Sequence, residues 1–263
     1  MPEPSQRLDP TQRFSDRADY YVRSRPGYPR AIVDFCRDEL QLGREDSVAD
    51  IGAGTGLLSE LFLQNGNPVF AVEPNEPMRR AAERNLSHYP NFHSTPGTAE
   101  KTTLPAASIP FVIAGQAFHW FDPSGARAEF ERILRPSGWL LIIWNLRKKD
   151  SSEGFSAAYD AVVKEFQNPR DKGFYEKHIS RDSQAIRAFF APGDCEIKTF
   201  ANSQSLDLNG LIDRAFSSSN LPLPGNEGAD KMVERLREIF QQYSRNGVVV
   251  QPYDTQVYYG RLK

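Results

Sequence analysis

The chain has 263 residues, of which 25% are charged and 39% hydrophobic, with a formal net charge of −2 and a sequence pI of about 6.1. This length suits one large α/β domain with insertions. The nearly balanced charge creates no general attraction to nucleic acid or to an anionic membrane. The two cysteines are too few for a disulfide framework, the four histidines have no metal-ligand spacing, and no apolar run resembles a signal peptide or a membrane span. We therefore expect a cytoplasmic protein that binds no metal.

An aromatic and basic segment, residues 13–30, precedes the first predicted core element. Its prolines at positions 26 and 29 make it too irregular for a helix of the core. From Arg30 to Leu40 the apolar residues recur at helical spacing, and Gly43 follows. This pattern predicts a helix that flanks a sheet and ends at Gly43.

A short apolar run at residues 48–56, VADIGAGTG, continues into alternating glycines. Apolar residues at helical spacing follow from Leu57, so the pattern predicts a buried strand, a tight turn and a helix. Gly52 and Gly54 allow the backbone to turn sharply and to approach a ligand, and the start of the helix offers free N–H groups. Because Gly56 comes too early for the dinucleotide fingerprint GxGxxG, pyrophosphate is not the favoured ligand.

Two acids flank this glycine turn. Asp50 precedes the first glycine by two residues, where its carboxylate would repel a pyrophosphate but accept hydrogen bonds from an ammonium group. A second predicted strand, residues 69–72, leads into Glu73, twenty-one positions after Gly52, which is the offset at which an acid binds ribose hydroxyls. A ribose and an amino group together indicate S-adenosylmethionine. The alternative is a structural turn without a ligand.

The run from Asp50 to Gly56, followed by Glu73, resembles the cofactor site of the class I S-adenosylmethionine-dependent methyltransferases. The resemblance is good over residues 13–145 and weaker beyond them. A nicotinamide-dependent oxidoreductase is a rival interpretation of the same turn, but the early third glycine and the acid before the turn count against it.

The same resemblance implies that residues 13–30 fold over the cofactor as a lid. Tyr20, Tyr21 and Arg25 would then close on the methionine end. An arginine can bind a carboxylate with two hydrogen bonds, and an aromatic face can lie against a sulfonium. The alternative is that the tyrosines only pack the lid onto the rest of the protein.

Two segments after Glu73 are implied to hold the adenine. A helix is predicted from Pro74 to about Leu86, with Met78 in its first turn, where Met78 either lines the adenine or packs in the core. Residues 97–105 resemble the family pattern Gly-x-Ala-Glu-x-x-Pro with extra residues before the proline. A surface turn is the alternative for this second segment.

Residues 111–114 form a continuous apolar run, typical of a strand buried on both faces of a parallel sheet, and residues 92–94 are a weaker strand candidate. The stronger run leads into a polar and aromatic segment, residues 115–123. Ligands of open parallel sheets bind beyond the carboxyl ends of the strands, so this segment is expected beside the cofactor. Gln116 is predicted to bond the methionine part. His119 is the best-placed base, or else it bonds a carbonyl in a packed floor.

The segment at 115–123 is similar to the branch of the family that includes trans-aconitate methyltransferase. In the second half, Arg147 begins a basic turn that either holds an acidic substrate or is solvated. The family resemblance implies that the helical residues 151–190 roof the substrate pocket. Further elements are predicted at residues 124–134 (helix), 139–144 (strand), 195–200 (strand), 206–220 (helix and loop), 232–243 (helix) and 248–262 (strand). Hairpin-like pairing at the sheet edge is expected for the last strand.

We therefore predict an α/β fold with a doubly wound, seven-stranded, mostly parallel sheet and a helical cap, formed as one domain over residues 1–263. The lid is expected at 13–30, and the cap and linkers around the sixth strand at 146–247. The expected cofactor-binding residues are Asp50, Gly52, Ala53, Gly54, Gly56, Glu73, Pro74, Met78, Thr98, Ala99, Glu100, Gln116, Ala117, His119 and Trp120.

The predicted activity is transfer of the methyl group of S-adenosyl-L-methionine to a small-molecule acceptor, through an oxygen or carboxylate nucleophile. His119, Arg25 and Tyr20 are the expected catalytic residues. A nucleic-acid or protein methyltransferase is the nearest alternative, although the Asn/Asp-Pro-Pro-aromatic motif that grips a flipped base does not follow the fourth strand and the sequence contains no basic stripe. A non-catalytic cofactor-binding protein is a further alternative.

Overall fold

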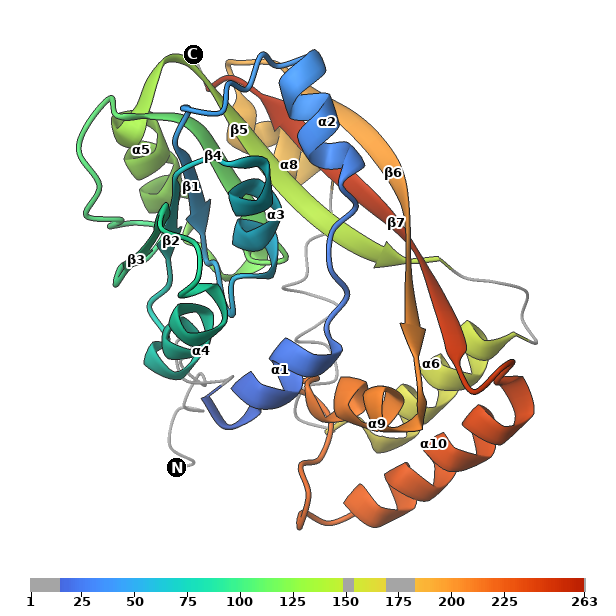
Figure 1. Ribbon diagram of the computed structural model, residues 1–263. Helices are drawn as coiled ribbons and strands as arrows, with labels where there is room; N and C mark the ends of the chain where they lie inside the picture. The colour runs from blue at the N-terminus through green and yellow to red at the C-terminus, as the bar shows by residue number, and fades with distance from the viewer. Residues whose placement is uncertain (1–14, 149–153, 169–182, 263) are drawn as a thin grey trace, which may run out of the picture.

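Seven strands form one sheet in the order β3-β2-β1-β4-β5-β7-β6 in the computed structural model, which describes residues 15–148, 154–168 and 183–262. Strand β7 runs antiparallel to both β5 and β6, and the other neighbouring strands are parallel. The predicted seven-stranded, mostly parallel, doubly wound sheet is therefore confirmed (Figure 1). The strands are β1 Val48–Ile51, β2 Val69–Val72, β3 Phe92–Thr95, β4 Ile109–Gly115, β5 Leu134–Arg147, β6 Cys195–Leu206 and β7 Val249–Gly260.

Helices lie on both faces of the sheet and beyond its carboxyl edge (Figure 1). They include two short 3₁₀ turns, one before the first helix and one after β4. The helical elements are η1 Ser15–Arg17, α1 Ala18–Ser24, α2 Ala31–Asp38, α3 Leu57–Asn65, α4 Glu76–Leu86, η2 Phe118–Trp120, α5 Pro123–Ile133, α6 Phe155–Phe166, α8 Ser183–Phe190, α9 Leu208–Phe216 and α10 Ala229–Tyr243.

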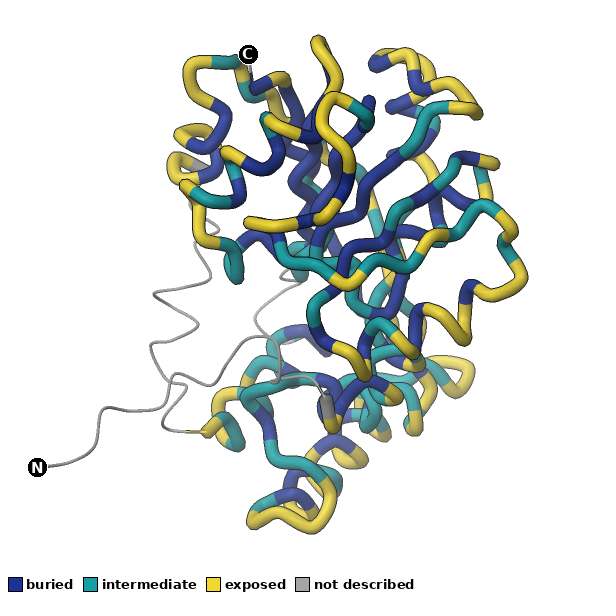
Figure 2. Tube along the Cα trace, turned by 90° about the vertical axis from the view of Figure 1, so that its left-hand side faces the viewer, coloured by how far each residue is buried: buried dark blue, intermediate teal, exposed yellow. Residues whose placement is uncertain are grey.

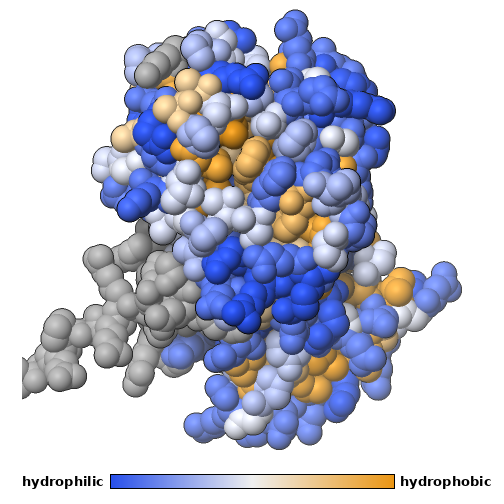
Figure 3. All heavy atoms as spheres, turned by 60° about the vertical axis from the view of Figure 1, so that its left-hand side comes forward, coloured by the Kyte–Doolittle hydropathy of each residue, from blue (hydrophilic) through white to orange (hydrophobic). Residues whose placement is uncertain are grey.

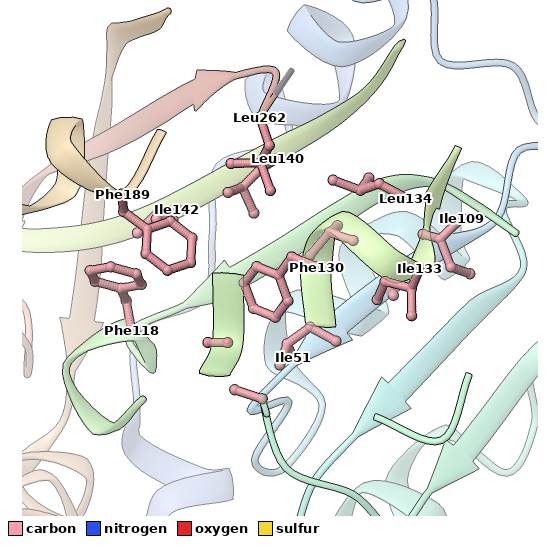
Figure 4. Packing of buried hydrophobic residues seen from close by; sticks show 14 of the residues in the cluster. Ile51, Ile109, Phe118, Phe130, Ile133, Leu134, Leu140, Ile142, Phe189 and Leu262 are labelled. Atoms are coloured by element: carbon pink, nitrogen blue, oxygen red, sulfur yellow. The ribbon is translucent and has the colours of Figure 1, made fainter. Parts of the chain in front are cut away.

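The central strands send alternate side chains into two cores, as the pleat of a strand requires. Ile51 and Ile142 pack with α5 and α8 on one face, where the ring of Phe189 lies 4.9 Å from that of Phe118 (Figure 4). Val48 and Leu141 pack with α2 and α3 on the other face. Figure 2 shows the buried chain concentrated along these strands. The apolar runs are continuous because both faces are covered.

A third core lies in the cap, away from the sheet. It joins α6, α9 and α10 through Tyr159, Leu211 and Leu236, which are all buried. Strands β6 and β7 pair from Cys195↔Gly260 to Leu206↔Val249, and their far ends reach past β5 into this core. Two long strands thus connect the cap to the sheet (Figure 1).

As expected, the last strand pairs in a hairpin-like, antiparallel manner at the sheet edge, where β6 is the outermost strand. Two expectations about element ends need correction. The helix expected to end at Gly43 ends at Asp38, and the N–H of Gly43 bonds the Asp46 carboxylate in the following turn. The sixth strand runs to Leu206 instead of ending at 200, since its outer part pairs with β7 beyond the sheet.

Helix α1 is attached to the end of α9 by arginines. The guanidinium of Arg25 donates to the carbonyl of Ser217 at 2.7 Å, and Arg23 pairs with Asp213 at 2.7 Å. A buried Arg17 donates to three carbonyls at or beyond the C-terminus of α9, those of Phe216, Ser218 and Leu221. Cations are favoured there by the helix dipole and by the unpaired carbonyls. The N-terminal segment therefore lies against the cap.

The predicted boundaries of the lid and cap, and the single-domain organisation, remain predictions. Residues 13 and 14 of the lid and residues 149–153 and 169–182 of the cap lie outside the described residues. Within the described residues no helix is both long and apolar enough to cross a membrane. On the face in Figure 3 hydrophilic side chains predominate and hydrophobic ones surface in separate groups, as on ordinary protein surfaces.

Candidate functional site

A cavity of about 490 Å³ lies at the carboxyl ends of the parallel strands, between the sheet and the cap. This volume is within the range of small-molecule sites. The turns after β1, β2 and β4 form one end of it, with Gly54, Glu73 and Gln116 in the lining. Helices α6 and α9 and strand β7 form the other end. An open α/β sheet places ligands at this edge.

The glycine turn after β1 has a backbone that other residues rarely adopt. Gly52 has a φ of +71° and Gly54 a φ of +58°. The N–H of Gly52 donates to the carbonyl of Val72 at 2.9 Å, which ties the turn to β2. A Cβ added to Gly52 would lie 2.6 Å from the Cβ of Ala117. The turn is therefore packed closely against the segment that follows β4.

Replacing Gly52 with alanine is expected to lower the free energy of unfolding by about 2 kcal/mol or more, because the substitution combines backbone strain with this close approach. Gly225→Ala is the matched control, since Gly225 also has a positive φ of +83° but has no neighbour within 4 Å of an added Cβ. Urea unfolding of both variants measures the difference. Equal losses would show that the contact with Ala117 contributes nothing.

The Glu73 carboxylate joins two turns at the cavity wall. It is 8% exposed; its Oε2 accepts from the N–H of Gly54 and its Oε1 from the N–H of Asn75, both at 2.8 Å. Burial raises its pKa, while the two N–H bonds act in the opposite direction. Each oxygen keeps further lone pairs, so the carboxylate can still accept hydrogen bonds from a ligand.

Asp50 lies beneath the turn. It is 1% exposed, is absent from the cavity lining, and its Oδ2 accepts from the hydroxyl of Ser59 at 2.7 Å. Burial raises its pKa to about 7, the Ser59 hydrogen bond opposes the rise, and the Glu73 charge adds to it. The expected direct contact with a ligand ammonium is therefore not supported by this position.

The segments predicted for the adenine do meet at the cavity. Met78 is buried in the first turn of α4 and lines the cavity, as do Thr98, Ala99 and Glu100. The Glu100 Oε1 accepts from the N–H of Asp122 at 2.8 Å. This bond fixes the 97–105 segment to the segment after β4.

The polar and aromatic segment after β4 also faces the cavity. Gln116 has a φ of +56°, and its Nε2 donates to the carbonyl of Asn145 at 3.1 Å. The ring of His119 lies 4.5 Å from that of Trp120 and 5.4 Å from that of Trp144. His119 is thus held between two aromatic rings at the cavity wall. Its role in proton transfer remains a prediction.

Most of the predicted site residues line the cavity, and four do not. Those that line it are Arg25, Gly52, Gly54, Glu73, Pro74, Met78, Thr98, Ala99, Glu100, Gln116, Ala117, His119 and Trp120. Besides Asp50, two residues of the turn itself, Ala53 and Gly56, are absent from the lining, and the Ala53 carbonyl accepts from the N–H of Gly56. Tyr20 packs with its ring 5.4 Å from that of Phe216, so the expected catalytic contact by Tyr20 is not supported. The neighbouring Tyr21 lines the cavity instead.

Several lining residues were not predicted as site residues. Tyr159 in α6 is buried in the cap core and also lines the cavity. Arg214 in α9 and Tyr253 in β7 lie in segments without a motif. Tyr28, within the predicted lid segment, lines the cavity, and a Cβ on Gly115 would lie 2.5 Å from its hydroxyl. The signal that could have identified such residues from the sequence is a polar side chain within an otherwise apolar stretch.

Comparison with known proteins gives a family model, described as a methyltransferase domain, that matches residues 49–142. An uncharacterized methyltransferase of Mycobacterium bovis is 36% identical over 54% of this chain, a match that covers 55% of that relative's length. A Dictyostelium discoideum protein named as a methyltransferase is 30% identical over 76% of this chain and 74% of its own. A structure from Anaeromyxobacter dehalogenans, described as a type II methyltransferase, has a TM-score of 0.67 at 22% identity and covers 90% of this chain and 98% of that one.

Two further similar proteins have names that state a substrate. A malonyl-[acyl-carrier protein] O-methyltransferase of Halalkalibacterium halodurans is 32% identical over 36% of this chain and 37% of its own length. Haemonchus contortus phosphoethanolamine N-methyltransferase 2, solved with phosphomonomethylethanolamine and S-adenosylhomocysteine, has a TM-score of 0.58 at 13% identity. It covers 97% of this chain and 58% of that one, and the likeness is one of fold.

The sheet order, the glycine turn and the buried acid after β2 define a class I methyltransferase fold whose cofactor is S-adenosylmethionine. The chain belongs to the S-adenosylmethionine-dependent methyltransferase family. Membership in this family removes the nicotinamide oxidoreductase from consideration.

Proposed function

We propose that the protein transfers the methyl group of S-adenosylmethionine to an oxygen nucleophile, a hydroxyl or a carboxylate, of a small-molecule acceptor. One observation carries this proposal. The same cavity is lined by the glycine turn and Glu73 at one end and by arginine and tyrosine side chains at the other. The Halalkalibacterium relative is named as an O-methyltransferase, which supports an oxygen acceptor. The resemblance of residues 115–123 to the trans-aconitate branch supports the same choice.

The residues at the sheet end fit this cofactor. Glu73 offers acceptor lone pairs for the ribose hydroxyls from a position fixed by two backbone N–H groups. Met78 and the 98–100 segment offer an apolar face and polar edges for the adenine. At the glycine turn, an added Cβ on Gly54 would reach within 3.5 Å of the Met78 side chain, so the turn leaves room that a larger residue would fill. When bound, the cofactor supplies an electrophilic methyl group.

The protein's part in catalysis is therefore to orient the acceptor and to exclude water. Tyr21, Trp120 and Trp144 line the cavity with aromatic rings, which offer water few hydrogen-bond partners. Arg25 is held by its bond to the Ser217 carbonyl and by the ring of Tyr21, 4.7 Å from the guanidinium. From there Arg25 can bind a carboxylate at the cavity. His119 takes the proton when the acceptor is a hydroxyl, whereas a carboxylate acceptor needs no base.

Calorimetric titration with S-adenosylmethionine and S-adenosylhomocysteine tests the cofactor, with binding expected in the micromolar range, about −8 kcal/mol. Incubation with methyl-labelled S-adenosylmethionine and a panel of small carboxylic acids and alcohols then tests transfer. We expect label in a solvent-extractable product, and release of that label by mild base identifies a methyl ester. Binding with no transfer to any acceptor would favour the non-catalytic alternative, and label in protein or nucleic acid would contradict the small-molecule acceptor.

A further inference from the structure

The end of the cavity formed by the cap is lined by polar side chains from three elements. Tyr159 comes from α6, Arg214 from α9 and Tyr253 from β7, and all three line the cavity. The Arg214 guanidinium is hydrogen-bonded to the hydroxyl of Tyr253 and lies within electrostatic reach of Tyr159 and Tyr21. The cap core holds the helices that carry Tyr159 and Arg214 in place.

The positive charge of Arg214 is not matched by an acid. Within the described ranges no carboxylate forms an ion pair with this half-buried side chain. Arg147, which also lines the cavity, differs because it pairs with Asp160 at 2.6 Å and lies 5.4 Å from the centre of the Tyr159 ring. A buried or half-buried charge is costly unless a partner compensates it. Arg214 therefore has Tyr253 as a neutral partner but no charged partner within the described ranges, and an anionic group of a ligand would supply one.

Two buried donors point to the same kind of ligand. Tyr159 is 4% exposed, and its hydroxyl has no hydrogen-bond partner in the part of the chain that the structure describes. The indole N–H of Trp144, which is 3% exposed, likewise has none there. A buried polar group without a partner costs about 1–3 kcal/mol, and such groups are rare in native proteins. A ligand rich in acceptor oxygens would satisfy both.

Charges are also segregated along the cavity. Glu73 and Glu100 line the sheet end, whereas the arginines of the lining, Arg25, Arg147 and Arg214, come from the predicted lid, the end of β5 and the cap. An anionic group of a ligand is therefore attracted to the end of the cavity that the lid and the cap form. The planar guanidinium favours carboxylate or phosphate oxygens over neutral carbonyls.

We propose that Arg214, Tyr159 and Tyr253 form a subsite for an oxyanion, a carboxylate or phosphate group, that belongs to the acceptor but is not the atom that receives the methyl group. The proposal rests on the proposed function, because it divides the acceptor into a reacting oxygen near the cofactor and an anionic anchor in the cap. The acceptor is thus a bifunctional compound whose two ends lie at opposite ends of the cavity. Arg214 sets specificity and does not contact the reacting atoms.

Binding of paired probes to the protein saturated with S-adenosylhomocysteine tests this subsite. The pairs are hexanoate with hexanamide, and phenyl phosphate with phenol, so that each pair differs in the anionic group on one skeleton. In wild type we expect at least one anion to bind about 10-fold or more tightly than its neutral partner. Arg214→Gln should abolish that preference, and Tyr159→Phe should reduce it severalfold, because the hydroxyl donor is lost.

Arg23→Gln is the matched control, since it removes a positive charge that pairs with Asp213, next to Arg214 in α9, outside the cavity. It should leave the anion preference unchanged. If the Arg214→Gln variant binds S-adenosylhomocysteine with unaltered affinity, the sheet end of its cavity is intact. The pair that shows the preference identifies the oxyanion as carboxylate or phosphate.

The subsite is overturned if wild type shows no anion preference in either pair, or if Arg214→Gln retains the preference. Either result leaves the proposed function standing as long as S-adenosylhomocysteine binds. Failure of that first binding step would instead contradict the proposed function itself.

Discussion

Replacing Glu73 with alanine is expected to weaken the binding of S-adenosylhomocysteine by at least about 100-fold. The substitution removes the acceptors for the ribose hydroxyls and also leaves the N–H groups of Gly54 and Asn75 without their partner. Hydrogen bonds to a charged group contribute about 1.5–3 kcal/mol each. The loss of two such bonds from the ribose hydroxyls to the carboxylate therefore exceeds the roughly 2.7 kcal/mol that corresponds to a 100-fold change in affinity. Calorimetric titration measures the effect.

Two other variants test whether the loss of affinity is specific to the Glu73 carboxylate. Glu73→Gln keeps one acceptor oxygen for the backbone and should fall between wild type and Glu73→Ala. Glu76→Ala removes an exposed acid from the same segment, where it pairs with Arg80, and should bind normally. An affinity of Glu73→Ala within a few-fold of wild type would exclude Glu73 from the cofactor site.

Replacing Asp50 with asparagine is expected to raise the free energy of unfolding of the cofactor-free protein by up to about 4 kcal/mol at pH 8. The pKa of Asp50 rises from 3.8 to about 7 because burial disfavours the charged form. Each unit of pKa shift corresponds to about 1.36 kcal/mol. An asparagine amide resembles the protonated carboxyl and can still accept the hydrogen bond from Ser59. Urea unfolding at a series of pH values measures the gain.

The sign of this pH dependence follows from the direction of the shift. Below about pH 4 Asp50 is protonated in both the folded and the unfolded chain, so wild type and variant should be equally stable. Between about pH 4 and pH 7 the unfolded chain loses its proton first, and wild type loses stability as the pH rises. Asp230→Asn, which changes an exposed acid in α10, should show no such gain. A variant no more stable than wild type at pH 8 would contradict the raised pKa of the buried Asp50 carboxyl.

The parallel half of the sheet could be predicted because its strands are buried on both faces. Such strands appear as short apolar runs, and β1, β2 and β4 were found in this way. The antiparallel pair was harder, since β6 and β7 leave the sheet and alternate in burial along a ribbon that reaches the cap. Alternation of apolar and polar residues predicts the ends of a strand poorly when different parts of the strand face different cores. Which strand took the edge depended on pairing that the sequence pattern does not encode.

The sheet end of the cavity could be predicted from sequence, and the cap end could not. A glycine turn needs particular residues at fixed spacing, because only glycine adopts its backbone cheaply. Tyr159 and Arg214 carry no such constraint, since any helix can place a polar side chain at the rim of its buried face. Asp50 is a different case. Its position in the motif predicts a ligand contact, which stays a prediction, and the fold places it beneath the turn, where its carboxylate accepts from the Ser59 hydroxyl.

The attachment of α1 to α9 by Arg17 means that the roof of the cavity is built from both ends of the chain. The segment that the family model matches, residues 49–142, contains the glycine turn and Glu73 but neither α1 nor the cap helices. Two relatives can therefore agree throughout that segment and still enclose different acceptors. A substrate that is established for one relative therefore applies to another only if the two also match at residues 15–30 and 154–262.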